Sequence, residues 1–329
     1  LPAMAGRRTL VLDATRAVVS ACAAAAGELV AIQPWRPHFD ALAAAGIPAR
    51  PRAADDDAGF DLVLLPLGRN RARNLARLAE AVGRAAPGGW IVAAGSNDIG
   101  AARYAAQVGA TRMIARHRGR AMLLARAQAP ADALLDRWRA EGGQRRHAST
   151  GHVSAPGAFA WDRVDAGSRL LAAALPAGIA GEAADLGAGW GFLAASLAAR
   201  CPGLRRIDLH EADHDALDAA RLNLAEAATR LEIGFHWTDV VRGLGGRRYD
   251  AIVSNPPFHD THDADPAIGI GFIRAAAQAL REGGRFWLVA NRHLPYERAL
   301  GSAFARVARI GEAEGYKLFE ASGAQNVPG

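Results

Sequence analysis

The feature that most constrains the fold is an alternation of apolar, strand-like runs with helical segments, which occurs once in each half of the chain. In the first half, the runs lie at residues 9–13, 28–33, 60–66, 89–94 and 121–125. In the second half, runs ending at Asp185, Glu211, Trp237, Ser254 and Ala290 precede a hairpin-like pair near residues 305–311 and 316–321. Strands that alternate with helices indicate a parallel, doubly wound sheet. The sequence therefore predicts an α/β protein made of two tandem Rossmann-like folds.

Composition predicts two domains, and the charge is compatible with an anionic partner. A chain of 329 residues accommodates a domain at 1–129, a polar linker at 130–152 with a short helix at 131–140, and a domain at 153–329. The formal net charge is +6, and arginines cluster at 69–73, 116–120, 145–147 and 247–248. Such clusters form either a solvated surface or a face for RNA phosphates.

Other global features exclude several classes of protein. No apolar run approaches the length of a membrane span, and residues 1–8 lack the apolar core of a signal peptide, so we expect a cytoplasmic protein without a membrane partner. Cys22 and Cys201 lie far apart, which predicts neither a disulfide framework nor a metal site. We expect a monomer or a weak homodimer.

One apolar strand runs directly into two prolines. Residues 249–258 read YDAIVSNPPF, and Pro256 and Pro257 end the strand because proline cannot donate to a sheet ladder. The Asn255 side-chain oxygen and the Pro256 carbonyl can accept both hydrogens of an –NH2 group, while Phe258 stacks on a planar substrate. This pattern predicts a methyl-transfer site for a planar amine, against the simpler interpretation of a turn that only caps a sheet.

A glycine-rich turn follows an earlier strand in the same half. Residues 183–191 read AADLGAGWG, and glycines allow a tight turn and close backbone approach by a bulky ligand. A dehydrogenase would share this weak signal. However, Asp185 precedes the glycines, where it can meet a cationic amino-acid group, and the Gly-x-Gly-x-x-Gly spacing of a dinucleotide site is missing. Both details favour S-adenosylmethionine.

Further acidic residues follow the next two strands. Glu211 lies about 20 residues after the glycines, where a carboxylate can hold ribose hydroxyls, and Asp213 is predicted to cap the following helix. Asp239 could meet an adenine amino group or be a solvated turn residue. The polar stretch at 259–266 could form a substrate lid, and its spacing does not favour a metal site.

The first half repeats the architecture without the chemistry. Asp13 follows its first strand without glycines, and Pro66 stands where the second half has Asn255. We therefore expect this half to have lost cofactor binding. Its arginines at 69, 71, 73 and 116–120 could hold RNA phosphates, or the half could be purely structural.

The second half resembles class I S-adenosylmethionine-dependent methyltransferases, and the whole chain resembles the small-subunit ribosomal RNA guanine-N2 methyltransferases of RsmC type. The resemblance is carried by PGAF and DAGSRLL within 156–171, DLGAGWG at 185–191, NPPFHD at 255–260, VANRHLPY at 289–296 and YKLFEA at 316–321. That family pairs a degenerate amino-terminal methyltransferase fold with an active carboxy-terminal one. The resemblance implies S-adenosyl-L-methionine as cofactor, S-adenosyl-L-homocysteine as product, and 16S rRNA or the 30S subunit as partner.

The resemblance also implies residue roles. The catalytic clamp around the guanine would be Asn255, Pro256, Pro257 and Phe258. The cofactor would be held by Asp185, Gly187, Ala188, Gly189, Gly191, Glu211, Ala212, Thr238, Asp239 and Asn255.

The predicted reaction is methylation of the exocyclic N2 amine of a guanine in 16S rRNA. Positioning of the amine would supply most of the catalysis. Three alternatives remain open. Enzymes that methylate a 23S rRNA guanine share most motifs, protein-glutamine methyltransferases use Asn-Pro-Pro on a planar amide, and a non-catalytic RNA-binding protein could keep the fold.

Overall fold

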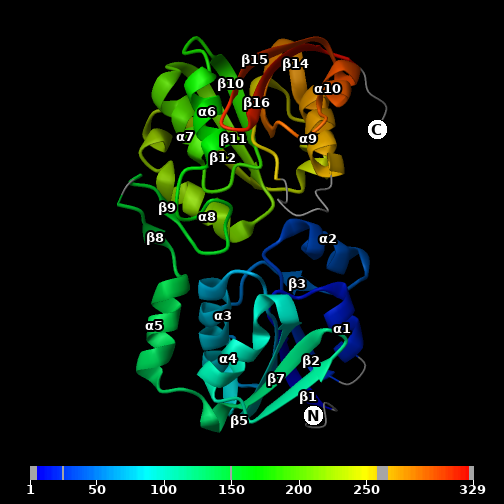
Figure 1. Ribbon diagram of the computed structural model, residues 1–329, viewed down its shortest axis with the longest axis vertical. Helices are drawn as coiled ribbons and strands as arrows, with labels where there is room; N and C mark the ends of the chain where they lie inside the picture. The colour runs from blue at the N-terminus through cyan, green and yellow to red at the C-terminus, as the bar shows by residue number, and fades with distance from the viewer. Residues whose placement is uncertain (1–5, 24–25, 149, 258–265, 326–329) are drawn as a thin grey trace. The chain divides into compact units, whose positions relative to one another are not determined.

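The computed structural model describes residues 6–23, 26–148, 150–257 and 266–325 (Figure 1). The chain divides into two compact units by its internal contacts. The first contains Leu1–Arg145 and Ala155–Gly157, and the second contains Arg146–Ser154 and Ala158–Gly329. In its described residues, each unit is built around one seven-stranded sheet flanked by helices. The prediction of two tandem doubly wound α/β folds is therefore confirmed.

The first unit orders its strands β3-β2-β1-β4-β5-β7-β6. Its strands are β1 (Arg7–Val11), β2 (Ala26–Ile32), β3 (Ala49–Arg50), β4 (Phe60–Pro66), β5 (Ala85–Ser96), β6 (Arg112–Arg116) and β7 (Gly119–Ala125). Its helices are α1 (Arg16–Ala23), α2 (Arg36–Ala44), α3 (Arg71–Arg84), α4 (Ala101–Val108) and α5 (Asp132–Gly142), with short 3-10 turns η1 (Asn97–Ile99) and η2 (Arg126–Gln128). Helix α5 lies in the segment predicted as a linker and packs against α3.

The second unit has the same order, β12-β11-β10-β13-β14-β16-β15. Its strands are β10 (Ala180–Leu186), β11 (Gly203–Glu211), β12 (Glu232–Trp237), β13 (Tyr249–Ser254), β14 (Leu280–Asn291), β15 (Phe304–Ala313) and β16 (Tyr316–Ala324). Its helices are α6 (Ala166–Ala174), α7 (Phe192–Arg200), α8 (His214–Asn223), α9 (Pro266–Ala279) and α10 (Glu297–Ala303), with η3 (Ala227–Thr229) and η4 (Val240–Arg242). A separate two-stranded sheet joins β8 (Arg145–Arg146) and β9 (Val153–Ser154).

Both sheets are mixed for the same reason. The strands joined through helices pair in parallel, as β10 does with β11 and β13, because the chain must cross over the sheet between them. The final hairpin pairs antiparallel, β16 lying between β14 and β15. In each unit the chain adds strands first on one side of the first strand and then on the other. This reversal leaves a crevice at the carboxyl ends of the strands.

Some helices and strands were not predicted from the sequence. Strands β3 and β6 were not predicted in the first half, nor was α10 in the second. The β6 residues are mostly exposed and include Arg112 and Arg116, so the strand lacks the apolar run that reveals a buried strand. Strand β3 spans only two residues, too few for a periodic signal.

Each unit has its own apolar core. In the second unit, one face of the sheet packs against α6 and α7 through Leu171 and Leu197, and the other packs against α9 through Ile273. Within the part of the chain described, no helix combines the length and apolarity needed to cross a membrane.

Candidate active site

The predicted site residues of the second unit meet at one edge of its sheet. Strands β12, β11, β10 and β13 are neighbours and run in parallel, so their carboxyl ends lie along the same edge. The paired register sets Asp185 of β10 beside Leu209 of β11 and Val253 of β13. The loops after these strands therefore converge on one crevice, although they are far apart in sequence.

The glycine loop after β10 depends on left-handed backbone conformations. The φ angles are +71° at Gly187, +54° at Gly189 and +88° at Gly191. Residues other than glycine disfavour this left-handed region because their Cβ atom clashes with the backbone. A Cβ added at Gly187 would lie 3.0 Å from Cε1 of Phe272, whereas one added at Gly189 would meet no atom within 4 Å. The Gly187 and Ala188 N–H groups donate to the His210 carbonyl. The loop is thus anchored at its start and open at Gly189, where a ligand can approach the backbone.

Asp185 is buried at the start of this loop. Its Oδ2 accepts a hydrogen bond from the Ala194 N–H at 3.0 Å, while its buried Oδ1 has no hydrogen-bond partner among the described residues. Burial, opposed by the Ala194 N–H and reinforced by the Glu211 charge, raises the pKa of Asp185 to about 7. An orphaned carboxylate oxygen of this kind is suited to a cationic ligand group, which would favour its ionised form.

The Glu211 carboxylate accepts hydrogen bonds on the other side of the loop. Its Oε2 accepts from the Gly189 N–H at 2.7 Å and its Oε1 accepts from the Asp213 N–H at 2.8 Å. Burial raises the pKa of Glu211 to about 7. The Asp213 charge adds to this increase, whereas the hydrogen bond from the Asp213 N–H opposes it. Asp213 caps α8 by accepting from the Asp215 N–H, as predicted. Each Glu211 oxygen keeps a further lone pair for a hydroxyl donor.

The loop after β12 is held by its own contacts. The Thr238 N–H donates to the Glu211 carbonyl at 2.9 Å, and the Ala212 carbonyl accepts from the Trp237 indole N–H at 2.9 Å. Asp239 caps η4 by accepting from the Val241 N–H at 3.2 Å. The Thr238 bond places the start of this loop beside Glu211, in agreement with the pairing of Glu211 with Trp237, and Asp239 follows directly.

The strand end at Asn255 carries the most specific geometry in the site. The Asn255 side chain is buried, and its Nδ2 donates to Asp165 Oδ2 and to Ser168 Oγ, both at 2.8 Å. Its Oδ1 is buried and finds no hydrogen-bond partner in the described structure. Both N–H donors of the amide are therefore used, and the side chain presents a single unused acceptor.

Asp165 and Ser168 hydrogen-bond to the Asn255 amide, and neither residue was expected at this site from the sequence. Asp165 caps α6, accepting from the Ser168 N–H at 2.8 Å with the same Oδ2 that receives Asn255. The cap signature was readable from the sequence, but its pairing with Asn255, 90 residues away, was not. Pro256 is buried and Pro257 follows at the strand end, whereas Phe258 and the stretch 259–265 lie outside the described residues.

A second polar cluster lies on the face of the sheet away from α7. Asp208, His210 and His236 are close enough to share one metal ion. The two imidazoles are stacked with centroids 4.7 Å apart and 16° between their planes, so their in-plane lone pairs cannot converge on one ion. The Tyr249 hydroxyl donates to Asp208 Oδ2 at 2.9 Å. Burial would raise the pKa of Asp208, but the nearby His236 ring, the Tyr249 hydroxyl and the Arg206 guanidinium hold it at about 2, so the cluster is a polar part of the core held by hydrogen bonds and charge.

Comparisons with known proteins agree with this geometry. The chain is similar to a 16S rRNA N2 G1207 methyltransferase of T. Thermophilus solved in complex with AdoMet and guanosine, with 27% identity, a TM-score of 0.78, and coverage of 96% of this chain and 88% of that one. It is also 35% identical over 163 residues to the ribosomal RNA small subunit methyltransferase C of Shewanella loihica, and 35% identical over 164 residues to that of Klebsiella pneumoniae subsp. pneumoniae.

Those two alignments cover 50% of this chain and 46% and 47% of the relatives, so the chain spans about half the length of the curated relatives it matches. The model of the methyltransferase small domain matches residues 150–320, just over half of the chain. This match coincides with the unit that carries the glycine loop, the two buried carboxylates and the Asn255 clamp. The chain therefore belongs to the methyltransferase small domain family.

Proposed function

We propose that the second unit transfers a methyl group from S-adenosylmethionine to the exocyclic N2 amine of a guanine in 16S rRNA. The observation that carries this proposal is the unused, buried Oδ1 of Asn255. Asp165 and Ser168 take both amide N–H groups and fix the orientation of the side chain, so the acceptor Oδ1 is the one polar atom left for a substrate. An acceptor in a fixed position selects a substrate that donates, such as an –NH2 group on a planar base.

The residues around the glycine loop fit S-adenosylmethionine. When bound, this cofactor supplies an electrophilic methyl group on a sulfonium ion. Asp185 would face its cationic amino-acid group through the orphaned Oδ1, Gly189 would give the ligand access to the backbone, and Glu211 would accept from ribose hydroxyls. Asp239 would contact the adenine amino group from the next strand end.

Asn255 would act by orientation rather than by proton abstraction. A neutral amide is not a base, so Oδ1 would accept one N–H of the guanine amine and direct the nitrogen lone pair out of conjugation with the ring. The proton displaced from the nitrogen would pass to water. Positioning of reacting groups can account for several kcal/mol of a barrier, roughly 7–11 kcal/mol in the best intramolecular reactions.

The relatives support the choice of ribosomal RNA. The structural relative with guanosine bound aligns across nearly the whole chain, and the names of the curated relatives specify the small ribosomal subunit. A protein-glutamine substrate would offer the same planar –NH2, but it would not account for the net charge of +6.

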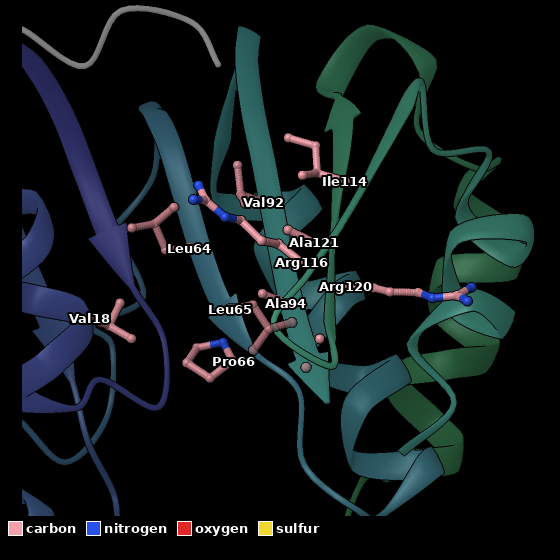
Figure 2. Close-up of a pocket in the computed structure, with 12 residues that line it drawn as sticks. Val18, Leu64, Leu65, Pro66, Val92, Ala94, Ile114, Arg116, Arg120 and Ala121 are labelled. Atoms are coloured by element: carbon pink, nitrogen blue, oxygen red, sulfur yellow. The ribbon is translucent and has the colours of Figure 1, made fainter. Parts of the chain in front are cut away.

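For the first unit we propose a role in holding RNA phosphates. Of its predicted basic residues, Arg71 lies 3.8 Å from Glu141 and Arg73 lies 3.6 Å from Asp13. Arg118 lies at the tip of the β6–β7 hairpin, and Figure 2 shows the Arg120 side chain pointing away from Leu64, Val92 and Ala121; neither arginine has an ion pair with another described residue. Replacing both by alanine should lower the salt dependence of RNA binding by a slope of about 2, at about 1 for each lost phosphate contact.

The experiment that tests the function uses radiolabelled S-adenosylmethionine with unmodified 30S subunits, 50S subunits, or a ribosomal protein extract. We expect N2-methylguanosine to carry label after digestion of the 30S sample alone. Label in 50S alone would retain the chemistry and overturn the target. Label in protein that resists ribonuclease would overturn RNA as the substrate, and bound cofactor with no labelled product would overturn the reaction.

A further inference from the structure

The loop after β14 lies at the same edge of the second sheet as Asn255. Strands β13 and β14 pair in parallel, with Ser254 beside Leu288, so both strands end in the same direction. Asn255 lies one residue beyond Ser254, and Arg292 lies four residues beyond Leu288. The offset between them is about 10 Å along the strands, at roughly 3.3 Å per residue. We refer to residues 291–296, which read NRHLPY, as the rim loop.

Hydrogen bonds fix the backbone of the rim loop at its start. The Arg292 N–H donates to the Gly315 carbonyl, in the turn between β15 and β16, at 2.8 Å. The His293 N–H donates to Asn291 Oδ1 at 3.1 Å, and the Leu294 N–H donates to the Asn291 carbonyl at 3.0 Å. The protein itself therefore sets the backbone positions of the two basic residues.

Buried side chains hold the rest of the rim loop. Lys317 of β16 is buried, and its ammonium group donates to the Leu294 carbonyl at 3.1 Å and forms an ion pair with Glu297. Tyr296 is buried as well, and a Cβ added at Gly269 of α9 would lie 1.9 Å from its hydroxyl oxygen, so the ring packs directly on α9. A loop that is already ordered loses little conformational entropy when it binds a ligand.

Two basic side chains of the rim loop have no acidic partner in the described structure. Arg292 and His293 are exposed, and neither forms an ion pair with another described residue. Other arginines of this unit are neutralised, as Arg281 is by Asp250 at 2.7 Å and Glu182 at 3.0 Å. A guanidinium presents N–H donors in a planar fork that matches two phosphate oxygens, and an imidazole adds a further N–H donor. The rim loop therefore presents donors for an anion at the edge where we propose that the substrate binds.

The first unit makes the equivalent backbone contact without the cations. The Asn97 N–H donates to the Arg118 carbonyl at 2.9 Å, just as the Arg292 N–H donates to the Gly315 carbonyl. The registers of the two sheets place Asn97 at the position of Arg292, and Asp98 follows it. The first unit thus forms its sheet with a neutral and an acidic residue at these positions, so the fold does not require cations there.

We propose that Arg292 and His293 bind a phosphate group of the RNA strand that carries the target guanine. This inference rests on the proposed function and extends it to the RNA backbone beside Asn255. The Arg292 guanidinium takes the phosphate through its paired N–H donors, and the His293 imidazole donates one further N–H. Contacts to phosphate carry no sequence information, so the rim loop positions the strand while Asn255 selects the amine.

The test measures RNA binding to the full chain by fluorescence anisotropy, with a fluorescein-labelled single-stranded RNA that contains one guanine. Arg292→Ala should raise Kd about tenfold, because a charged hydrogen-bond donor is lost. It should also lower the slope of log Kd against log salt by about 0.7, the value for one phosphate contact on a single strand. Arg292→Lys keeps the charge but not the planar fork, so it should restore the slope and only part of the affinity.

The matched control is Arg306→Ala. Arg306 of β15 is also exposed and has no ion pair with another described residue. It pairs with Ser322, which in turn pairs with Arg285 of β14. Arg285 lies six residues before the end of β14, so the control is about 20 Å from the rim loop along the strands. Arg306→Ala should leave both Kd and the salt slope unchanged.

Methyl-transfer kinetics with unmodified 30S subunits separate a phosphate contact from a structural role. Arg292→Ala should raise KM for the subunits about tenfold, while kcat and the calorimetric Kd of S-adenosylmethionine change by less than about twofold. The double variant Arg292→Asn, His293→Asp copies the first unit and should raise KM further, because it brings a carboxylate next to the RNA backbone. All these side chains are exposed, so the variants should fold, as checked by thermal melting.

The proposal is overturned if Arg292→Ala keeps the wild-type salt slope, or if Arg306→Ala weakens RNA binding as much. A loss of kcat or of cofactor affinity with unchanged RNA affinity would also overturn it, because Arg292 would then act on the structure of the site. Anisotropy requires no methyl transfer. An absence of N2-methylguanosine from wild-type 30S samples would therefore overturn the proposed function alone, and RNA binding would still decide the phosphate contact.

Discussion

The two units share a strand order and a register but differ at the strand ends where we propose that the second unit holds its cofactor and substrate. In the paired registers of the two sheets, Val11 of β1 has the position that Asp185 has in the second unit. The Val11 side chain is fully buried. Gln33 stands where the second unit has Glu211, and its Nε2 donates to the Ala14 carbonyl at 2.6 Å. At the positions proposed to hold the cofactor in the second unit, the first unit thus has a buried apolar side chain and an amide that hydrogen-bonds to its own unit. The sheet therefore forms from apolar strands in register without buried carboxylates at these positions, so the carboxylates of the second unit are not required by the fold.

The loop after the first strand shows the same divergence. Asp13 adopts a left-handed φ of +47° where the second unit has Gly187 at +71°. Its carboxylate lies 3.6 Å from Arg73 and 3.5 Å from Arg77. The backbone is left-handed at this position in both units, but in the first unit the side chain there forms ion pairs with two arginines.

The largest effect is expected at Asn255. Asn255→Ala removes the unused Oδ1 acceptor and should lower kcat about 100- to 1000-fold, the usual cost of losing one positioned polar group. Cofactor affinity, measured by calorimetry, should change much less. The matched control is Pro66→Ala at the equivalent strand end of the first unit, which should leave kcat unchanged. Equal losses in both variants would contradict the assignment of catalysis to the second unit alone.

The second-largest effect is expected when the Glu211 carboxylate is replaced by an amide. Glu211→Gln copies the first unit and should weaken cofactor binding about 10- to 100-fold, because hydrogen bonds to a charged group are worth about 1.5–3 kcal/mol. The reciprocal Gln33→Glu should create no second cofactor site. Calorimetric stoichiometry checks both statements, and two cofactors per chain in the Gln33→Glu protein would show that one side chain separates the units.

A pH dependence should follow from the raised pKa of Asp185. A cationic ligand group favours the ionised carboxylate, so cofactor affinity should rise by up to about tenfold between pH 6 and pH 8, as Asp185 ionises with its pKa of about 7. Asp185→Asn should weaken binding and reduce this pH dependence, of which Glu211, whose pKa is also about 7, keeps a part. A wild-type affinity that falls with pH would refute the role of the carboxylate.

The ligand-free protein should show the opposite trend in stability. A carboxyl group whose folded-state pKa is raised stabilises the fold fully below its unfolded pKa, and this contribution is lost as pH rises through about 7. The Tm of the ligand-free protein should therefore fall between pH 5 and pH 8 by more than that of Asp185→Asn. Identical Tm profiles would show that Asp185 is not buried as described.

The smallest effect is expected at Ser168. Ser168→Ala removes one of the two acceptors that orient the Asn255 amide and should lower kcat about fivefold, the value of one neutral hydrogen bond. Ser168→Thr, which restores the hydroxyl, should recover part of the loss. The matched control is Ser196→Ala in α7, where the hydroxyl bonds only the Phe192 carbonyl of its own helix. A loss confined to KM would indicate that Ser168 acts on binding instead of orientation.

Much of the fold was predictable because its signals are local. Apolar runs such as 60–66 and 249–254 identify buried strands without any knowledge of their neighbours, and they correspond to β4 and β13. The exposed strand β6 was missed because its residues carry no apolar run. The site loops could be placed at one edge because the carboxyl ends of parallel strands must lie together.

The sequence by itself determined which residues stand at the strand ends: Asp185 before the glycines, Glu211 on the next strand, and Asn255 before two prolines. Only the tertiary structure decided how they are held, through the pairing of Asn255 with Asp165 and Ser168 and through the burial that raises the pKa of Asp185. The physical reason is one of range. Secondary-structure signals act over a few residues, whereas amide orientation and desolvation depend on groups that register and packing bring together from distant parts of the chain.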